Sequence, residues 1–232
     1  MTSPPAPFVI GIDGPSGSGK SSVSRAVAAR LGAGYLDTGA MYRALTWWCR
    51  HTEVDLGDAD AIVAAALGLP LEIGDDPQAP TVAVDGIDVA AAIRTSEISS
   101  LVSTVATVPE VRVEMQLRQR ALIDDFAVRH GACVAEGRDV TTVIAPDAQV
   151  RILLTASEEA RLRRRSLEVH GATDEAAIAA TRDQVVRRDR DDSTVSQFTE
   201  AAEGVTVVDT SDLDFEASVA AVMDVVAAAR AS

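Results

Sequence analysis

The sequence predicts an α/β fold in which a mostly parallel sheet lies between two layers of helices. Short apolar runs, which are typical of buried strands, alternate along the chain with longer segments of helical periodicity. Aromatic residues make up only 3% of the chain, so alanine, valine and leucine fill the core, which suits helices packed on a parallel sheet. The 232 residues are enough for one well-buried core with one small inserted unit.

The first predicted elements are a strand and a helix joined by a glycine-rich turn. Residues 8–13 form a short apolar run that stops at this turn, as a buried parallel strand does. Residues 20–31 carry apolar side chains at helical spacing, and glycines at 32 and 34 end the helix. Two further helical patterns follow, at 40–51 and 58–67.

Residues 68–104 change character and are predicted to form an insertion. Two alternating runs are separated by a polar turn at 74–80, and a tight Asp85-Gly86 pair follows them. This pattern indicates a small antiparallel unit. We therefore divide the chain into a core, formed by residues 1–67 and 105–232, and an insertion at 68–104.

The C-terminal half returns to alternating strands and helices. The pattern predicts a helix at 109–130, an arginine-rich helical region at 157–188 that is interrupted at Gly171, and an amphipathic helix at 215–230. Between them, apolar runs predict three strands, at 131–135, 150–154 and 205–210. Strands that alternate with helices imply a parallel sheet covered on both faces.

Charge and composition exclude several classes of protein. The formal net charge of −14 disfavours a nucleic-acid-binding surface, which needs a basic face. No apolar run is long enough for a membrane span, and the N-terminus lacks the pattern of a signal peptide. The two cysteines lack metal-site spacing, so we expect buried thiols in a reducing, cytoplasmic setting. Nothing in the sequence predicts an assembly, so we expect a monomer.

The turn after the first strand carries the most specific motif. Residues 14–21 match G-x-x-x-x-G-K-S/T at every fixed position. Glycines let the backbone fold tightly around a phosphate, and the helix that begins near Lys20 adds its positive dipole end. We expect Lys20 to reach the β- and γ-phosphates of ATP and the Ser21 hydroxyl to ligate Mg²⁺. The predicted ATP-binding residues are Gly14, Pro15, Ser16, Gly17, Ser18, Gly19, Lys20, Ser21 and Ser22.

A phosphate-binding loop alone does not define a reaction. The chain contains twenty arginines, a single lysine and no asparagine, so it cannot contain the N-K-x-D motif of guanine-specific switches. It is also too short for a large ATPase motor. Of these classes, a compact kinase is the one that remains. Phosphoryl transfer depends on positioning and charge neutralisation, so a kinase that acts on a phosphate acceptor needs no catalytic base. Accordingly, we interpret the three histidines as structural or surface residues.

Two segments that follow strands or connections are candidates for binding the acceptor. Thr38 and Arg43, within residues 37–43, are spaced to face a phosphate, although a helix N-cap followed by a surface arginine explains the pattern equally well. Residues 136–139, Glu-Gly-Arg-Asp, follow a buried strand at the edge where parallel sheets bind ligands. Charged residues of both signs at that place favour a functional role.

Two arginine-rich segments near the C-terminus leave alternatives open. The arginines at 161 and 163–165 suit a mobile lid over the ATP phosphates, but such a run is more often a solvated helix face. Residues 187–192 mix both signs, which suits either a clamp for phosphate and ribose or an exposed helix with salt bridges.

Taken together, these segments resemble bacterial cytidylate kinases of the short, monomeric type, and the resemblance covers nearly the whole chain. The pairing of Asp-Gly-Pro-Ser-Gly with Asp-Thr-Gly-Ala-Met-Tyr-Arg is far more specific than a phosphate-binding loop alone. The matching blocks lie at residues 12–20, 36–43, 93–95, 108–112, 136–139 and 188–192.

The resemblance implies a P-loop kinase core, a monophosphate-binding insertion and a lid at about residues 157–190. It also implies phosphorylation of CMP and dCMP by ATP with Mg²⁺. The implied catalytic residues are Lys20, Arg138, Arg164 and Arg188. The implied acceptor-binding residues are Thr38, Arg43, Ser103, Arg112, Arg138, Asp139, Arg188 and Asp192, of which Ser103, Arg112 and Asp139 face the cytosine ring.

Two positions depart from the family pattern. Many members have an arginine where this chain has Val195, so one contact to the sugar is missing here. Members often have aspartate where Glu136 stands, which keeps the carboxylate but lengthens its reach by one methylene.

Two other functions stay open on the sequence. The chain could be a kinase of the same fold that phosphorylates another small metabolite or nucleotide, or an ATP-sensing regulatory protein without turnover. An alcohol acceptor would require a nearby base, and a pure sensor would need only one nucleotide pocket. The arginine-rich segments favour a phosphate acceptor over both.

Overall fold

A computed structural model of the chain describes residues 7–174, 176–182, 190, 193, 196 and 198–231. Among them, five parallel strands form the main sheet, in the order β2-β6-β1-β7-β8. The protein is an α/β protein of the P-loop kinase type, as the sequence predicts. The strands are β1 (Phe8–Asp13), β2 (Gly34–Asp37), β6 (Ala132–Gly137), β7 (Val150–Thr155) and β8 (Thr206–Asp209).

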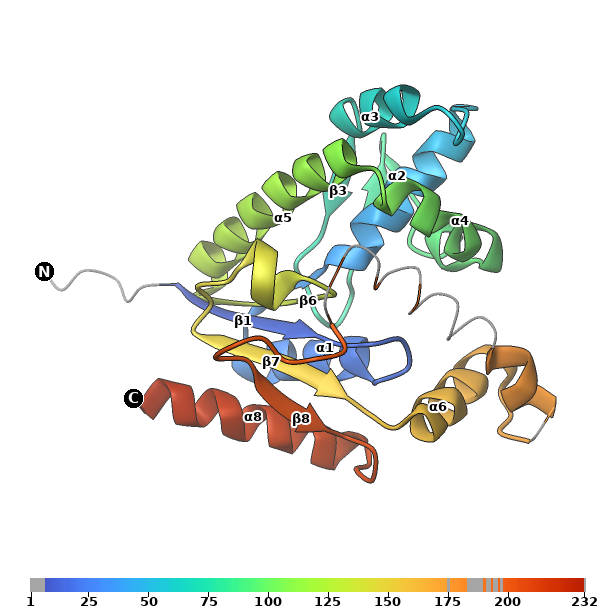
Figure 1. Cartoon of the computed structure of the whole chain (residues 1–232). Helices are drawn as coiled ribbons and strands as arrows, with labels where there is room; N and C mark the ends of the chain where they lie inside the picture. Colours follow the sequence, from blue (N-terminus) through green and yellow to red (C-terminus); the bar gives the residue numbers. More distant parts are fainter. Residues whose placement is uncertain are drawn as a thin grey trace, which may run out of the picture.

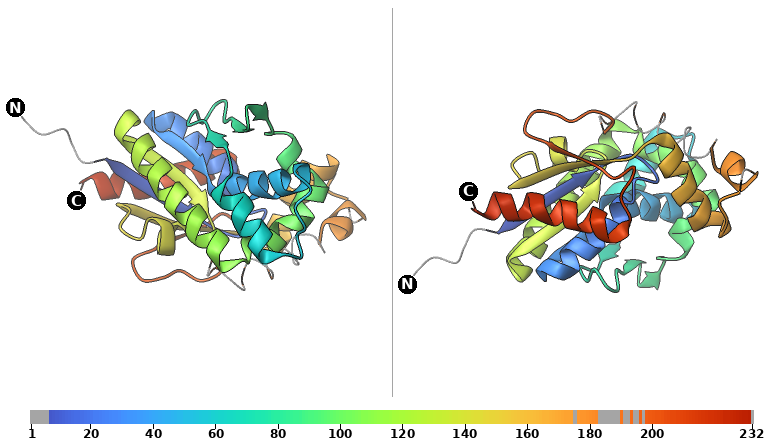
Figure 2. Two further views of the ribbon diagram at one scale, coloured as in Figure 1. Left: turned by 90° about the horizontal axis from the view of Figure 1, so that it is seen from above. Right: turned by 90° about the horizontal axis from the view of Figure 1, so that it is seen from below.

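Helices cover both faces of this sheet (Figures 1 and 2). Two of them, α1 and α8, pack on one face around an apolar cluster that includes Ile10, Ile152 and Val222, while α2 and α5 pack on the other face. Among the described helices, none combines the length and the apolar character that a membrane span requires. The α-helices with bounds are α1 (Lys20–Leu31), α2 (Thr38–His51), α3 (Ala59–Leu67), α4 (Ser96–Ala106), α5 (Pro109–His130), α6 (Glu158–His170) and α8 (Phe215–Ala231).

A second, antiparallel sheet lies beside the main one and is built from β3 (Leu71–Ile73), β4 (Val82–Val84) and β5 (Ile87–Asp88). Asp85 and Gly86 both have positive φ, at 52° and 73°, which is the backbone of the tight hairpin turn that the sequence predicts. Apolar residues of this sheet share one cluster with α2, α3, α4 and α5. This continuous core fixes the small sheet against the main domain. The boundaries at 68 and 104 stay a prediction.

The carboxyl ends of three strands meet at one edge of the main sheet. Strand β1 ends at Asp13 before the glycine-rich loop, β2 ends at Asp37, and β6 ends at Gly137. The Asp37 carboxylate accepts a hydrogen bond from the Ala40 amide and so caps α2, which turns this helix away from the sheet. Segments that lie far apart in the sequence therefore converge at this edge.

Two elements differ from the sequence prediction. Residues 34–37 form strand β2, although Gly34, like Gly32, indicated only the end of α1. The strand is too short to show a pattern of its own and is defined by its pairing with β6. At the end of the predicted insertion, residues 96–106 form α4, which extends two residues past the predicted boundary and whose N-terminus is capped by the Thr95 hydroxyl. Helix α6 ends at His170 with Gly171 in a left-handed conformation, where the sequence predicts an interruption.

Candidate active site

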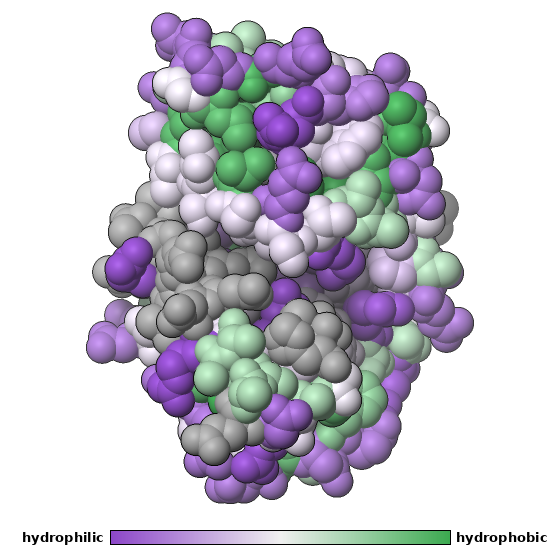
Figure 3. All heavy atoms as spheres, turned by 90° about the vertical axis from the view of Figure 1, so that its right-hand side faces the viewer, coloured by the Kyte–Doolittle hydropathy of each residue, from purple (hydrophilic) through white to green (hydrophobic). Residues whose placement is uncertain are grey.

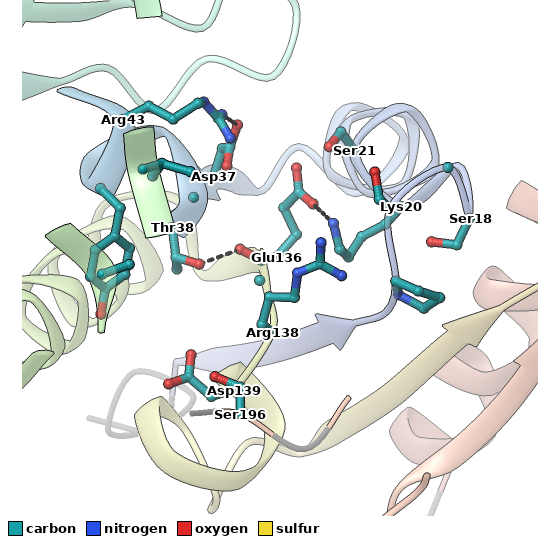
Figure 4. A pocket seen from close by; sticks show the side chains of 18 of the residues that line it. Ser18, Lys20, Ser21, Asp37, Thr38, Arg43, Glu136, Arg138, Asp139 and Ser196 are labelled. Carbon is teal, nitrogen blue, oxygen red and sulfur yellow. Dashed lines mark hydrogen bonds and ion pairs between the residues drawn. The ribbon is translucent and has the colours of Figure 1, made fainter. Parts of the chain in front are cut away.

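A cavity opens where the three strand ends converge (Figure 4). One wall is the glycine-rich loop with the start of α1, and the opposite wall is the start of α2 with one face of α4. The floor comes from the end of β6 and the residues that follow it. On the side that carries α4 and α6, hydrophilic residues lie on both the upper and the lower parts of the visible surface (Figure 3).

The glycine-rich loop has the geometry of a phosphate cradle. Gly17 and Gly19 have φ of 77° and 86°, values that side-chain-bearing residues rarely adopt. A Cβ on Gly14 would collide with the Leu154 carbonyl oxygen, so only glycine fits between the loop and β7. Gly19 is the N-cap of α1, and the helix directs its positive end into the cavity. All residues from Pro15 to Ser22 line this wall.

Lys20 pairs with Glu136 across the cavity. The Lys20 Nζ lies 2.8 Å from the Glu136 Oε2, and both side chains are largely buried. The other carboxylate oxygen of Glu136 accepts a hydrogen bond of 2.8 Å from the hydroxyl of Tyr35. The backbone oxygen of Glu136 accepts a third bond, of 2.8 Å, from the Thr38 hydroxyl. The sole lysine of the chain thus lies in a fixed, hydrogen-bonded setting.

The start of α2 presents a second charged pair. Arg43 is buried, and its guanidinium lies 2.8 Å from the Asp37 carboxylate, with Arg94 at 3.6 Å from the same group. Burial opposes ionisation of Asp37, but Arg43, Arg94 and Lys20 together hold its pKa below the usual range. The two guanidinium groups of Arg43 and Arg94 thus share the Asp37 carboxylate at this wall of the cavity. Both Thr38 and Arg43 line it, as the sequence predicts.

Arg112 and Asp139 form a third pair. The Arg112 guanidinium lies 2.5 Å from the Asp139 carboxylate and 3.3 Å from the Ser196 hydroxyl. Burial raises the pKa of Asp139, and the charge of Arg112 opposes this rise. Next to this pair the cavity is apolar, because Val102 and Ala106 of α4 line it. Ser103 lies between them but is not among the lining residues.

Arg138 bridges the floor and the glycine-rich loop. Its guanidinium donates a hydrogen bond of 3.0 Å to the Gly14 carbonyl oxygen and lies 4.2 Å from the centre of the Phe198 ring. The ring and the loop backbone hold the planar group in place at the cavity floor. A positive charge is thereby positioned between the loop and the guanidinium groups on the opposite wall.

The arginines of α6 divide into two kinds. Arg161 and Arg164 donate to backbone carbonyls of the glycine-rich loop, at Ser16 and Ser18 respectively. Arg164 also contacts Thr210 and is not among the lining residues, whereas its neighbour Arg165 is. The contacts of Arg164 support the loop backbone, and its predicted role in closing over phosphates stays a prediction.

Three positions of the sequence analysis, Arg188, Asp192 and Val195, lie outside the described residues. The structure also brings residues to the cavity that motif matching alone did not assign to a site. Arg94 belongs to the block at 93–95 and Glu136 follows a strand, so both had a signal in the sequence. Ser196, which lines the cavity, had none, because a single serine carries no pattern. The same holds for Tyr35, which does not line the cavity but contacts Glu136 from behind it.

The comparisons with known proteins show which family the chain belongs to. A family model described as cytidylate kinase matches residues 10–228. The chain belongs to the cytidylate kinase family. It is therefore a nucleoside monophosphate kinase, a transferase that binds nucleotides, with ATP implied as the phosphoryl donor.

Three relatives illustrate the similarity. A cytidylate kinase of Streptomyces avermitilis is 47% identical over 226 residues, which cover 97% of this chain and 94% of the relative. Cytidylate kinases of Cutibacterium acnes and Streptomyces coelicolor are 48% and 47% identical and cover 95% and 98% of this chain, or 96% of each relative. Among solved structures, an uncharacterized protein from Eubacterium ventriosum is similar with a TM-score of 0.50 at 10% identity, over 94% of this chain and 96% of that chain. This last likeness concerns the fold alone.

Proposed function

We propose that this kinase transfers the γ-phosphoryl group of ATP to CMP and dCMP, giving CDP or dCDP and ADP. The observation that carries the proposal is that the glycine-rich loop and the guanidinium groups of Arg43, Arg112 and Arg138 line one cavity. A donor triphosphate and an acceptor monophosphate both need such positive groups, and here the two sets face each other. Membership of the family and the names of the relatives support cytidine nucleotides as acceptors.

The donor side of the cavity suits the triphosphate of ATP. Backbone N–H groups of residues 16–22 and the positive end of α1 suit the phosphates, and Lys20 lines the same wall. Charge builds up on the equatorial oxygens of the γ-phosphoryl group during transfer, so a cation held there stabilises the transition state more than the ground state. We assign this role to Lys20 and Arg138, and to Arg164 and Arg188 as predicted lid and clamp residues.

The acceptor side suits a cytidine monophosphate. We propose that Thr38 and Arg43, at the start of α2, hold its phosphate together with Arg138, which also lines the cavity. The contact from Arg188 stays a prediction. The Asp139 carboxylate can accept a hydrogen bond from the exocyclic amine of cytosine, and Arg112 both orients Asp139 and offers donors of its own. Val102 and Ala106 give the flat ring an apolar surface. For Ser103 and Asp192, contacts to the base and the ribose stay predictions.

The residues present fit a magnesium ion, although the described part of the chain contains no group of three histidine, cysteine or carboxylate side chains that would hold a metal alone. Mg²⁺ prefers oxygen ligands and in such kinases is bound mainly by phosphates, waters and one or two protein groups. The hydroxyl of Ser21 and the carboxylates of Glu136 and Asp37 line the cavity. When bound, the ion supplies charge neutralisation between the β- and γ-phosphates.

Chemistry at this site needs no general base. An oxygen of the acceptor phosphate, already ionised at neutral pH, attacks the γ-phosphorus while the bond from that phosphorus to the bridging oxygen of ADP breaks. The protein positions both nucleotides in line and excludes water. We propose that the insertion at 68–104 and a lid at about 157–190 close over the two nucleotides. We also propose that the enzyme acts as a monomer in the cytoplasm, where its two buried, unpaired thiols stay reduced.

A coupled assay of ADP release tests the proposal. ATP and Mg²⁺ are held fixed while CMP, dCMP, UMP, AMP, GMP and a panel of hydroxy acids are offered in turn. The proposal predicts the highest kcat/KM with CMP and dCMP. Activity confined to another acceptor would favour a kinase of a different metabolite, and ATP binding without turnover would favour a sensor.

A further inference from the structure

Tyr35 lies behind the cavity, where its hydroxyl reaches the Glu136 carboxylate that pairs with Lys20. The tyrosine is 3% exposed, and its ring packs in the apolar cluster beneath α1. Successive residues of a strand point to opposite faces, and on β6 the side chains at 132, 134 and 136 share the face on which α1 lies. Tyr35 pairs with Val134 in the register of β2 and β6, so its long ring reaches diagonally to Glu136.

The three groups form a chain of contacts from the core to the donor site. The phenol donates 2.8 Å to one oxygen of Glu136, and the other oxygen lies 2.8 Å from the Lys20 Nζ. Burial and the negative charge of Glu136 raise the pKa of Tyr35 further above its already alkaline ordinary value, so the phenol keeps the proton that it donates. The Glu136 side chain is 2% exposed, which leaves little water to replace this donor.

Under the proposed function, Lys20 acquires new partners when the donor binds. The structure shows its ammonium group bound to Glu136, whereas a donor triphosphate on the glycine-rich loop requires it at the phosphates. A long, flexible glutamate would follow the ammonium group and add negative charge beside the γ-phosphate. A second hydrogen bond on its far oxygen resists this movement. We infer that Tyr35 is a positioning residue that holds Glu136 in place while Lys20 exchanges the carboxylate for the donor phosphates.

This inference rests on the proposed function for its kinetic consequences, but its structural core can be measured without turnover. Lys20 is the only lysine in the chain, so lysine labelled with ¹³C and ¹⁵N gives a single ammonium signal in NMR spectra. In Tyr35→Phe, the ring and its packing stay and only the hydroxyl is lost. We expect the Lys20 signal of the ATP-free protein to shift and broaden in Y35F, because the carboxylate is no longer fixed.

The kinetic experiment compares Y35F, Glu136→Gln and the double variant. Y35F is expected to lower kcat about tenfold, which is the effect expected from losing one hydrogen bond to a charged group. The KM for CMP should stay within about twofold of the wild-type value. If Tyr35 acts only through the charge of Glu136, the double variant has the kcat and the Lys20 signal of E136Q alone. Ser218→Ala is the matched control, because it removes a buried hydroxyl that bonds the Asp214 carbonyl oxygen, and neither residue lines the cavity. It is expected to lower Tm without changing kcat.

The outcomes separate this inference from the proposed function. A Lys20 signal that is the same in Y35F and the wild type overturns the inference, whatever the acceptor is. So does a double variant whose kcat is lowered by the product of the two single effects. A third outcome separates the two proposals. If the wild-type enzyme is inactive with CMP, the proposed acceptor is overturned. If the Lys20 signal nevertheless changes in Y35F, and Y35F causes no further change in the E136Q background, the role of Tyr35 is supported.

Discussion

The guanidinium group of Arg112 lies 2.5 Å from the carboxylate of Asp139 and thereby joins helix α5 to the residues that follow β6. Asp139 is 5% exposed, and a carboxylate so placed resists ionisation unless a positive charge faces it. Arg112 supplies that charge. The same pair lies where we propose that the cytosine ring binds, so the protonation of Asp139 and the recognition of the acceptor are linked.

The pH dependence of acceptor binding follows from this pair. The pKa of Asp139 is raised above 3.8, mainly by burial. Protonation of Asp139 removes the hydrogen-bond acceptor for the cytosine amine. The KM for CMP is therefore expected to rise as pH falls through this raised pKa. The rise should occur at a higher pH than for an ordinary aspartate. Because Arg112 lowers the pKa, Arg112→Met should move this acid limb to still higher pH. Steady-state kinetics between about pH 4.5 and 8 measure both effects. This range begins near the ordinary pKa of a carboxyl group and extends above it.

Asp139→Asn is the control for this prediction. Asparagine does not titrate in this range, so KM for CMP in D139N should be high and nearly independent of pH, with the affinity for ATP unchanged. An acid limb that persists in D139N would assign the titration to another group, such as the buried Asp13, whose pKa is also raised by burial.

Lys20→Ala tests the role of the sole lysine. We expect kcat to fall by about a hundredfold or more, since preorganised charge at the transferring group contributes effects of this size, while the dissociation constant of ATP rises by less than about tenfold. Arg30→Ala is the matched control: it removes a basic side chain from the same helix, and the ion pair of Arg30 with Glu216 is exposed. Turnover close to that of the wild type in K20A would show that another group neutralises the γ-phosphoryl charge.

Two neighbouring arginines of α6 should give opposite results. Arg164 donates to the Ser18 carbonyl and to Thr210, so Arg164→Met is expected to lower the free energy of unfolding by about 2 kcal/mol and to raise KM for ATP. Arg165 lines the cavity, so Arg165→Met should lower kcat about tenfold with little change in Tm. Urea unfolding and initial rates measure both. A loss of kcat in R164M at unchanged stability would instead support the predicted lid role of Arg164.

The close approach of Gly14 to β7 predicts the cost of a single methyl group. A Cβ at position 14 would meet the backbone oxygen of Leu154, which cannot move aside as a side chain does. Gly14→Ala is therefore expected to lower the free energy of unfolding by about 1–3 kcal/mol and to weaken ATP binding. Gly68→Ala is the control, because its Cβ would lie 3.5 Å from the Ala64 carbonyl oxygen, an ordinary contact. A G14A variant as stable as G68A would mean that the loop can move off the strand.

The sequence predicts the elements that have a local signal. The strands β1 and β7 are short apolar runs, and the helices α1 and α5 have apolar residues at helical spacing. The phosphate-binding loop carries a motif in which Gly14 and Gly19 are required by backbone geometry. Strand β2 and helix α4 were not predicted. Strand β2 has only four residues and is defined by its pairing with β6. Helix α4 follows a short 3₁₀ turn, and the alternating runs that precede it led to the prediction of an antiparallel unit for the whole segment.

By itself, the sequence determined that a phosphate-binding loop follows the first strand, that arginine-bearing segments follow later ones, and that these blocks resemble one kinase family. Only the tertiary structure decided which arginines line the cavity, because that depends on which way each helix face and strand end is turned. Arg165 rather than Arg164 lines it, and Tyr35, which has no motif, reaches Glu136 from a neighbouring strand. Spacing along a chain records local periodicity, whereas contacts between strands and helices arise from packing across the sheet.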